Sequence, residues 1–204
     1  MCDRKLIHIV DDEDAIRRSA SFLLKTSGYA VETWPSGVAF LKEVRHVEPG
    51  CILLDVRMPE MDGLEVQQWL AESGVTMPVI ILTGHGDISI AVRAMKAGAV
   101  DFLEKPFEKA SLLGSIETAF KKVAATDGKT LLAAEAEVIL GALTPRERDV
   151  LEGLAQGLPN KTIAYDLNIS PRTVEVHRAN LMTKLDVRSL SDALRIAFAA
   201  GMGA

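Results

Sequence analysis

Short apolar runs, each closed by a polar or charged residue, constrain the fold of this chain more than any other feature. The expected strands are residues 6–10, 30–33, 51–55, 79–82 and 101–103. Helical patterns alternate with them, at residues 14–27, from Ser36 onward, and at 64–72, 88–97 and 108–123. Nearly continuous apolar strands that alternate with helices predict an α/β fold, with a parallel sheet covered on both faces.

The residues at the ends of these strands carry the chemistry. Asp11 and Asp12 follow the first strand, Asp55 ends the third, Thr83 follows the fourth and Lys105 lies just beyond the fifth. Parallel strands bring their carboxyl ends to one edge of the sheet, where such folds bind ligands. Three carboxylates, a hydroxyl and an amine at that edge predict a site for a divalent metal and a phosphoryl group.

The residue types at this edge suit phosphoryl transfer. Magnesium is usually held by one or two carboxylates, water and phosphate oxygens, which Asp12 and Asp55 can supply with Asp11 beside them. Thr83 and Lys105 can bind phosphoryl oxygens, so that Asp55 becomes a nucleophile and forms an aspartyl-phosphate. Singly, each piece has a structural explanation, because residues 11–14 can cap a helix and Lys-Pro often lies in a loop. Their combination, in order and at the strand ends, favours the site.

Composition sets broad limits on the class of protein. With 204 residues, of which 48% are hydrophobic, the chain can form one large domain or two small ones. A net charge of −5 argues neither for nor against a nucleic-acid partner. Two cysteines make no disulfide framework, and Cys51 in a buried strand is expected to be a core residue. We find no membrane span and no signal-peptide pattern, so we expect a cytoplasmic protein without a membrane partner.

The pattern of elements changes along the chain and divides it into three segments. Residues 1–124 form the α/β domain, and residues 125–141 read as a partly helical linker that is too short to argue for a coiled coil. Residues 142–204 show helices only. Helix starts there are marked by capping residues, at Thr144 with Glu147, at Ser170 before Pro171, and at Ser189 with Asp192.

A short helix, a turn and a second capped helix predict a helix-turn-helix over residues 160–179. With Val174 at the centre of the buried face and 100° per residue, Leu181 and Leu185 return to that face. The expected DNA contacts are Lys161, Arg172, Thr173, Glu175, Val176, Arg178, Ala179 and Lys184. Among them, Arg172 or Thr173 can reach a phosphate or a base, Glu175 can accept from cytosine, and Val176 can contact a thymine methyl. Lys161, Arg178 and Lys184 suit phosphates. The alternative is a small helical bundle with a solvated charged face.

The first domain resembles the receiver domain of two-component response regulators. The resemblance is carried by Asp11-Asp12, Asp55-Val-Arg-Met-Pro59, Met61-Asp-Gly63, Thr83-Gly84 and Lys105-Pro106-Phe107. It implies a flavodoxin-like, doubly wound, five-stranded sheet of order 2-1-3-4-5 and a cis peptide before Pro106. It also implies Mg²⁺ (or Mn²⁺) on Asp11, Asp12, Asp55 and the backbone carbonyl of Arg57.

The same resemblance implies roles in switching and in the lifetime of the phosphate. Asp55 would take a phosphoryl group from the histidine of a sensor kinase, and Thr83 would move towards it. Phe102 is either an aromatic switch residue or a core residue, and we weigh the two equally. Arg57 and His85 are expected to tune the phosphate lifetime, or else to be solvated loop residues.

The helical tail resembles the LuxR-type output domain, so that the whole chain is similar to the NarL/FixJ family. The motifs are Leu143-Thr-Pro-Arg-Glu-Arg148, Gly157-Leu-Pro-Asn-Lys161, Ile163-Ala164 and Ser170-Pro-Arg-Thr-Val-Glu-Val-His177. Within the family, strings such as Gly84-His-Gly-Asp87 and Ala94-Met-Lys-Ala-Gly98 favour an activator of nitrogen-fixation or microaerobic genes. The implied partners are a FixL-like sensor histidine kinase, double-stranded promoter DNA, RNA polymerase and, on phosphorylation, a second copy of the chain.

Three rival functions compete with this interpretation. The first is a phosphohydrolase of the haloacid-dehalogenase type, which needs Asp-x-Asp after a strand, whereas here Arg57 stands in the second position. We therefore expect no enzyme activity beyond self-catalysed phosphoryl transfer to Asp55 and its slow hydrolysis. The second rival is a phosphorelay intermediate whose tail binds protein, and the third is a constitutive DNA-binding protein.

Overall fold

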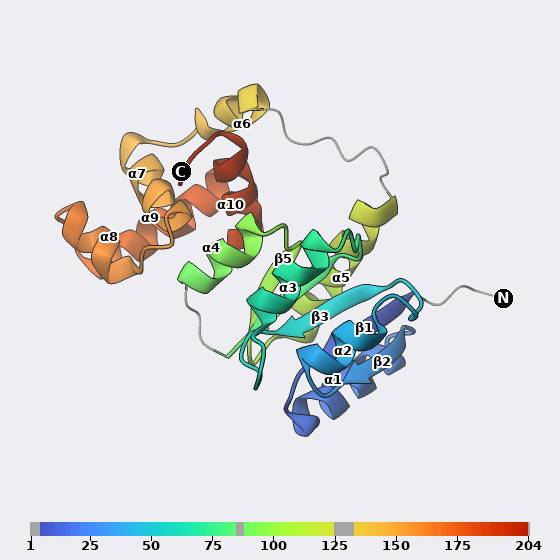
Figure 1. Ribbon diagram of the computed structural model, residues 1–204. Helices are drawn as coiled ribbons and strands as arrows, with labels where there is room; N and C mark the ends of the chain where they lie inside the picture. Colours follow the sequence, from blue (N-terminus) through green and yellow to red (C-terminus); the bar gives the residue numbers. More distant parts are fainter. Residues whose placement is uncertain (1–4, 85–87, 125–132, 204) are drawn as a thin grey trace. The chain divides into compact units, whose positions relative to one another are not determined.

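The computed structural model describes residues 5–84, 88–124 and 133–203. Its helices and strands (Figure 1) follow one another as β1 (Leu6–Val10), α1 (Asp14–Thr26), β2 (Ala30–Trp34), α2 (Gly37–Glu43), β3 (Cys51–Asp55), α3 (Gly63–Glu72), β4 (Val79–Thr83), α4 (Ile88–Lys96), β5 (Asp101–Glu104), α5 (Lys109–Ala124), α6 (Ala133–Leu140), α7 (Pro145–Ala155), α8 (Asn160–Asp166), α9 (Pro171–Lys184) and α10 (Leu190–Ala199). None of these helices is both long enough and apolar enough to span a membrane.

Backbone contacts divide the chain into two units. The first contains the five strands with α1, α2, α3 and α5, and the second contains α4 with α6 to α10. The stretch expected to link the domains falls partly outside the described residues, and its described part is the helix α6.

The first unit contains a parallel sheet of order β2-β1-β3-β4-β5, which confirms the predicted topology. The three inner strands are buried along their whole length, whereas the edge strands β2 and β5 are partly exposed. This difference is expected of a sheet with helices on both faces, because only the inner strands are covered on every side. Cys51 is fully buried in β3, which confirms it as a core residue, and burial raises the pKa of its thiol to about 12.

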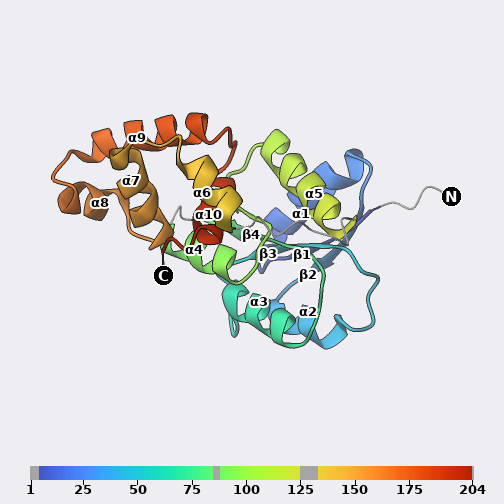
Figure 2. The ribbon, with the colours of Figure 1, turned by 90° about the horizontal axis from the view of Figure 1, so that it is seen from above.

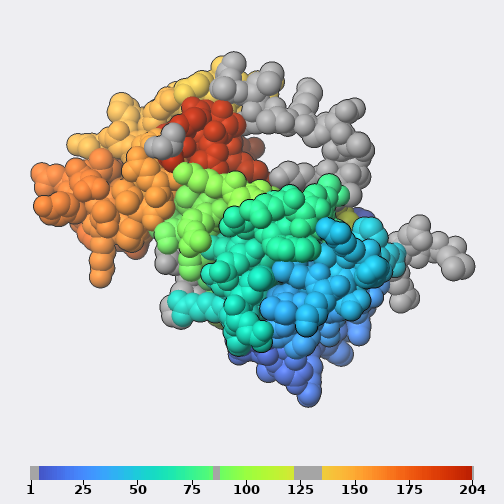
Figure 3. Space-filling model, in the orientation of Figure 1, coloured from blue at the N-terminus to red at the C-terminus, as the bar shows by residue number. Residues whose placement is uncertain are grey.

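Helices form layers on both faces of the sheet. Ala20 and Leu24 of α1, with three α5 residues, share one buried cluster with β1, β3 and β4. Figure 2 shows α1 and α5 on one side of the sheet and α2 and α3 on the other. In Figure 3 the facing surface of this unit is formed largely by α2 and α3. The sheet is thereby open to ligands at its strand ends rather than on its faces.

Several helix boundaries were readable from capping residues. The side chains of Ser36, Thr144, Ser170 and Ser189 accept backbone hydrogen bonds at the starts of their helices, as predicted. Gly28 follows the C-terminal end of α1 and has a φ of 95°, which a residue with a side chain rarely adopts. A capping box that was not predicted from the sequence, between Asp62 and Glu65, starts α3 at Gly63 instead of Leu64.

The second unit has a core of its own. Leu151 and Leu154 of α7, Val174 and Leu181 of α9 and Leu194 of α10 are all completely buried. The buried face predicted for the second helix of the helix-turn-helix is therefore confirmed. Figure 2 shows α9 running across α7, with α8 at its amino-terminal end.

An ion pair between a buried carboxylate and an exposed lysine joins α7 to α9. The Glu147 carboxylate accepts from the backbone N–H of Thr144 at 2.8 Å and from Lys184 Nζ at 2.7 Å, and Glu147 is only 3% exposed. The hydrogen bond from Lys184 is the main cause that lowers the pKa of Glu147 to about 2, and burial opposes it. Glu147 is thus ionised at neutral pH.

This ion pair predicts a stability that depends on pH. Because the folded-state pKa is depressed, the stabilisation is complete above the ordinary pKa of about 4.5 and is lost as the pH falls towards about 2. At pH 7 we expect Glu147→Gln to lower the free energy of opening of α7 and α9 by roughly 1–3 kcal/mol. Hydrogen exchange of their amides measures that free energy.

The control is an exposed pair in the same unit. Glu137 accepts from Arg148 Nη2 at 2.8 Å, but about half of the Glu137 side chain is exposed, so Glu137→Gln should change little. The difference between wild type and Glu147→Gln should shrink as the pH falls from 5 to about 3. A difference that stays constant with pH would show that the carboxylate charge does not stabilise the unit.

Candidate phosphoacceptor site and DNA-binding surface

The sheet register brings the predicted groups to one edge. Val10, the residue before Asp11, pairs with Leu54, the residue before Asp55, while Asp55 itself pairs with Leu82. Backbone hydrogen bonds continue beyond the strands, with Lys105 N donating to Thr83 O at 2.7 Å. Asp11, Asp55, Thr83 and Lys105 therefore come together as the sequence predicted.

Lys105 joins the two buried carboxylates. Its Nζ donates to Asp11 Oδ2 at 2.6 Å and to Asp55 Oδ1 at 2.5 Å. Asp11 is completely buried and Asp55 is 5% exposed, while the Lys105 side chain is 12% exposed. One ammonium thus faces two carboxyl groups in a poorly solvated place.

Burial and charge act against each other on the pKa values of this site. Burial raises the pKa of Asp55, while the hydrogen bond and the charge of Lys105 oppose that shift. Burial also acts to lower the pKa of Lys105, but the hydrogen bonds and charges of Asp11 and Asp55 raise it above its ordinary value. Lys105 is therefore a permanent cation at neutral pH.

Further contacts fix Asp11 but leave Asp12 at the surface. Asp11 Oδ1 accepts from the backbone N–H of Glu13 at 2.8 Å, and Arg17 Nη1 donates to the Asp11 carbonyl at 2.6 Å. Asp12 is exposed. Of the three predicted carboxylates, two share the lysine and the third lies at the solvent side of the site.

The donor set is compatible with a hard divalent cation. Asp11 and Asp55 offer carboxylate oxygens side by side, with Asp12 next in the chain, and such cations bind oxygen ligands together with water. In the part of the chain that the structure describes, no three histidine, cysteine or acidic side chains lie close enough to hold a metal ion by themselves. The oxygen donors fit magnesium and leave its remaining positions to water and substrate.

The loop between β3 and α3 depends on a glycine to which the sequence alone assigned no role. A Cβ on Gly63 would overlap the Asp55 carbonyl, so no other residue fits. Gly63 N donates to Val56 O at 2.8 Å and closes the loop over the end of β3. The signal was present in Met61-Asp-Gly63, which carried part of the resemblance to receiver domains but no structural explanation.

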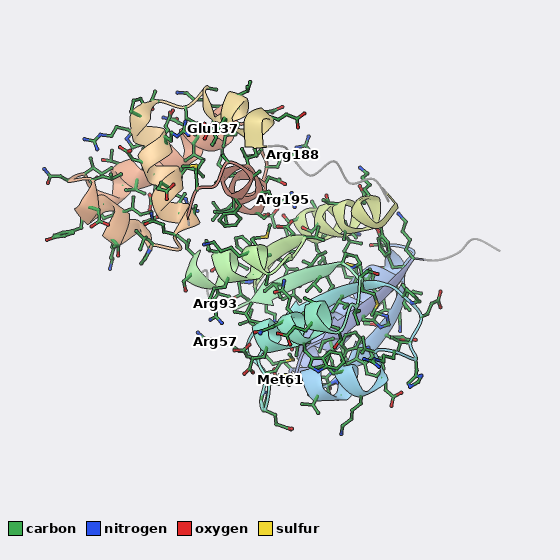
Figure 4. The ribbon with its side chains drawn as sticks, turned by 45° about the horizontal axis from the view of Figure 1, so that its top comes forward. Arg57, Met61, Arg93, Glu137, Arg188 and Arg195 are labelled. Atoms are coloured by element: carbon green, nitrogen blue, oxygen red, sulfur yellow. The ribbon has the colours of Figure 1, made fainter. Side chains whose placement is uncertain are left out.

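Arg57 and Met61 lie on this loop (Figure 4). Arg57 is exposed, whereas Met61 is half-buried. A backbone hydrogen bond from Arg57 reaches the Asp55 carboxylate and favours its charged form. The main chain of Arg57 thus contacts the site, while its side chain is available to solvent.

The remaining predicted site residues differ in how the structure places them. Thr83 is buried at the end of β4, and Phe102 is half-buried on β5. The peptide bond between Lys105 and Pro106 is cis, as predicted. His85 lies outside the described residues.

In the second unit, the helix-turn-helix presents the predicted outer face. Arg172, Glu175, Val176 and Ala179 of α9 are exposed, and 48% of Val176 is accessible although it is apolar. Ser170 caps α9 by accepting from Thr173 N at 3.1 Å, which leaves Thr173 half-buried at the helix start. The amino-terminal half of α9 is therefore the exposed surface expected of a recognition helix.

Three of the predicted DNA-binding cations have partners inside the domain. Arg178 is half-buried and donates to Asn160 Oδ1 at 3.1 Å, and burial lowers its pKa. Lys184 pairs with Glu147, and Arg172 pairs with Glu175 at 2.9 Å. For Lys161, no side-chain partner occurs among residues 5–84, 88–124 and 133–203. Arg178 and Lys184 thus hold helices together, and their contact with phosphates stays a prediction.

Comparison with known proteins supports both halves of this picture. The response regulator receiver domain matches residues 7–117, and the luxR family of bacterial regulatory proteins matches residues 141–197. The transcriptional regulatory protein FixJ of Rhizobium meliloti (strain 1021) is 47% identical over 97% of both chains. The chain belongs to the NarL/FixJ family of response regulators.

Two further relatives extend the comparison. The response regulator TodT of Pseudomonas putida is 43% identical, over 96% of this chain and 87% of TodT. The crystal structure of full-length FixJ from B. japonicum is similar with a TM-score of 0.58 and 44% identity, over 97% of each chain. This regulator is therefore most like FixJ, and it is a phosphorylation-activated, DNA-binding transcriptional regulator.

Proposed function

We propose that Asp55 is the phosphoacceptor of this regulator and that residues 142–204 read its phosphorylation out on promoter DNA. The observation that supports the first part is the Lys105 ammonium held between the buried carboxylates of Asp11 and Asp55. We retain the predicted domain boundaries, 1–124, 125–141 and 142–204, as part of this proposal. With promoter DNA as its target, the protein would act in the cytoplasm.

The phosphoryl transfer needs only positioning and neutralisation of charge. An Asp55 oxygen forms the bond to phosphorus as the bond between phosphorus and the histidine nitrogen of the kinase breaks, and the imidazole leaves with the electron pair. Lys105 and Thr83 bind phosphoryl oxygens. Mg²⁺ (or Mn²⁺), held by Asp11, Asp12, Asp55 and the Arg57 carbonyl, would neutralise charge on the entering group. Apart from this transfer and a slow hydrolysis, we propose no enzyme activity.

The phosphate would act through the surface around Thr83. Movement of Thr83 towards the phosphate would change the space open to Phe102, which is half-buried. Phe102 would then either turn inward as a switch residue or keep its place as a core residue. Arg57 and His85, near the site in sequence, would tune how long the phosphate survives. The changed surface would support a homodimer.

Dimerisation matters for DNA binding because one small domain with few available cations binds weakly. In a dimer the two DNA-binding domains are linked, so that once one domain is bound, the second binds its half-site in an intramolecular step. Promoter-bound dimers would then recruit RNA polymerase and activate genes such as those of nitrogen fixation. The match of the tail to the luxR family argues against a phosphorelay intermediate.

A sensor histidine kinase, FixL-like by the resemblance to FixJ, would dock on α1. Phe22 on this helix is 72% exposed, and it borders a hollow of about 330 Å³. Arg17 lines the same hollow and donates to the Asp11 carbonyl, so the surface is continuous with the site. An exposed aromatic residue beside basic side chains is a suitable anchor for a partner protein.

Replacing the nucleophile tests the central part of the proposal. With acetyl phosphate and Mg²⁺, the wild-type chain should dimerise and bind promoter DNA more than about tenfold more tightly, and Asp55→Asn should do neither. Glu43→Gln removes one exposed carboxylate at the end of α2 and should behave as wild type. Analytical ultracentrifugation and fluorescence anisotropy measure the two effects. Stimulated binding by Asp55→Asn would refute the proposal.

Changing the exposed aromatic residue tests the docking surface separately. Phe22→Ala should slow phosphoryl transfer from the phosphorylated kinase by about tenfold, because an aromatic contact is lost. Transfer from acetyl phosphate should be unchanged, since Phe22 lies on the surface of α1 and does not contact Lys105 or the carboxylates of Asp11 and Asp55. Tyr165→Ala removes an aromatic side chain that is 86% exposed on α8 and is the matched control. Equal slowing with both donors would contradict docking at α1.

A further inference from the structure

The recognition helix carries an acidic residue where a DNA-binding surface is expected to be basic. Glu175 lies on the exposed amino-terminal half of α9, three residues after Arg172. Arg172 Nη1 donates to Glu175 Oε2 at 2.9 Å, and 83% and 51% of the two side chains are accessible. The most exposed cation of this helix is therefore held by a carboxylate of the same helix.

Two of the other predicted DNA-binding cations are also engaged within the domain. Arg178 is turned towards Asn160, and Lys184 is paired with Glu147. Non-specific DNA binding arises from cations that replace counterions on phosphates. With Arg172 engaged by Glu175, Lys161 is the one predicted DNA-binding cation among the described residues that is left to provide this sequence-independent attraction.

Different DNA sites compete unequally with the ion pair. An exposed pair three residues apart on a helix shifts an equilibrium by only about twofold, so Arg172 can leave Glu175 when a better partner is present. A guanine edge is such a partner, because it accepts two parallel hydrogen bonds from arginine and favours the right base by about tenfold or more. A phosphate can also accept two hydrogen bonds from arginine, but it carries a full negative charge that Glu175 repels, whereas a guanine edge carries no net charge.

We propose that Glu175 is a specificity-determining residue that restrains Arg172 and releases it to a base edge in preference to a phosphate. This inference rests on the proposed DNA-binding function. It assigns Glu175 a role different from accepting a hydrogen bond from cytosine. The restraint slightly weakens binding to all DNA and weakens binding to non-specific DNA most. It therefore increases the preference of the protein for its specific site.

The test compares two duplexes and four variants of the full-length chain. One duplex is selected from a random pool by the phosphorylated wild type, and the other is a shuffled duplex of the same composition. The variants are Glu175→Gln, Arg172→Ala, the double variant and Asp149→Asn. Asp149 forms the corresponding exposed pair with Arg146 on α7, three residues apart at 3.7 Å, and is the matched control.

The expected result is a change in non-specific binding that requires Arg172. Glu175→Gln should bind the shuffled duplex about twofold more tightly per protomer. Its slope of log affinity against log salt should steepen by roughly 0.9 for each added phosphate contact. The preference for the selected duplex should fall accordingly. In the Arg172→Ala background the same substitution should have a clearly smaller effect, and Asp149→Asn should match wild type.

Three results would overturn the inference. Glu175→Gln could behave as Asp149→Asn, or its effect could persist undiminished without Arg172, which would indicate simple repulsion of phosphates. It could also lose affinity for the selected duplex alone, which would indicate that Glu175 reads a base. If the wild type itself shows no preference between the duplexes, the proposed DNA-binding function fails, and that result is distinct from all three.

Discussion

The two-carboxylate contact of Lys105 is the interaction on which the phosphoacceptor site depends. An ammonium and two carboxylates out of water are tolerable only when their geometry is good, and here both Nζ–O distances are 2.6 Å or less. The parallel sheet provides that geometry, because adjacent strands end together and the backbone hydrogen bond from Lys105 to Thr83 extends the pairing. Carboxyl oxygens beside a cationic lysine then suit a site that must accept a metal ion and a phosphoryl group.

The ends of the strands were predictable from sequence because the residues change there from apolar to polar or charged within one position. Continuous apolar runs fixed which residues are in the sheet, and the rule that parallel strands share a carboxyl edge placed Asp11, Asp55 and Lys105 together. The same reasoning could not predict that Asp11 is buried while Asp12 is exposed, because both aspartates directly follow the same apolar run. The close approach of Gly63 to Asp55 also could not be derived, because it depends on how a loop folds back over a strand.

Long-range polar contacts were the least accessible to sequence reasoning. His8, in the middle of β1, is buried and contacts the Glu48 carbonyl at 2.9 Å and the Trp34 indole at 3.3 Å. Glu147 was predicted from its capping box alone, yet it also receives Lys184 from 37 residues away. The sequence indicated Lys184 as a cation suited to phosphates, but only the packing of α7 against α9 shows that it already pairs with Glu147.

The proposed mechanism requires a single covalent event at a defined atom, and this can be observed directly. The full-length chain would be incubated with acetyl phosphate and Mg²⁺, reduced with borohydride to convert an acyl phosphate into a stable alcohol, digested and sequenced by mass spectrometry. We expect that the converted residue is Asp55 and that omission of the divalent cation abolishes the conversion. Conversion of Asp11 or Asp12 in place of Asp55, or conversion that does not need the cation, would contradict the mechanism.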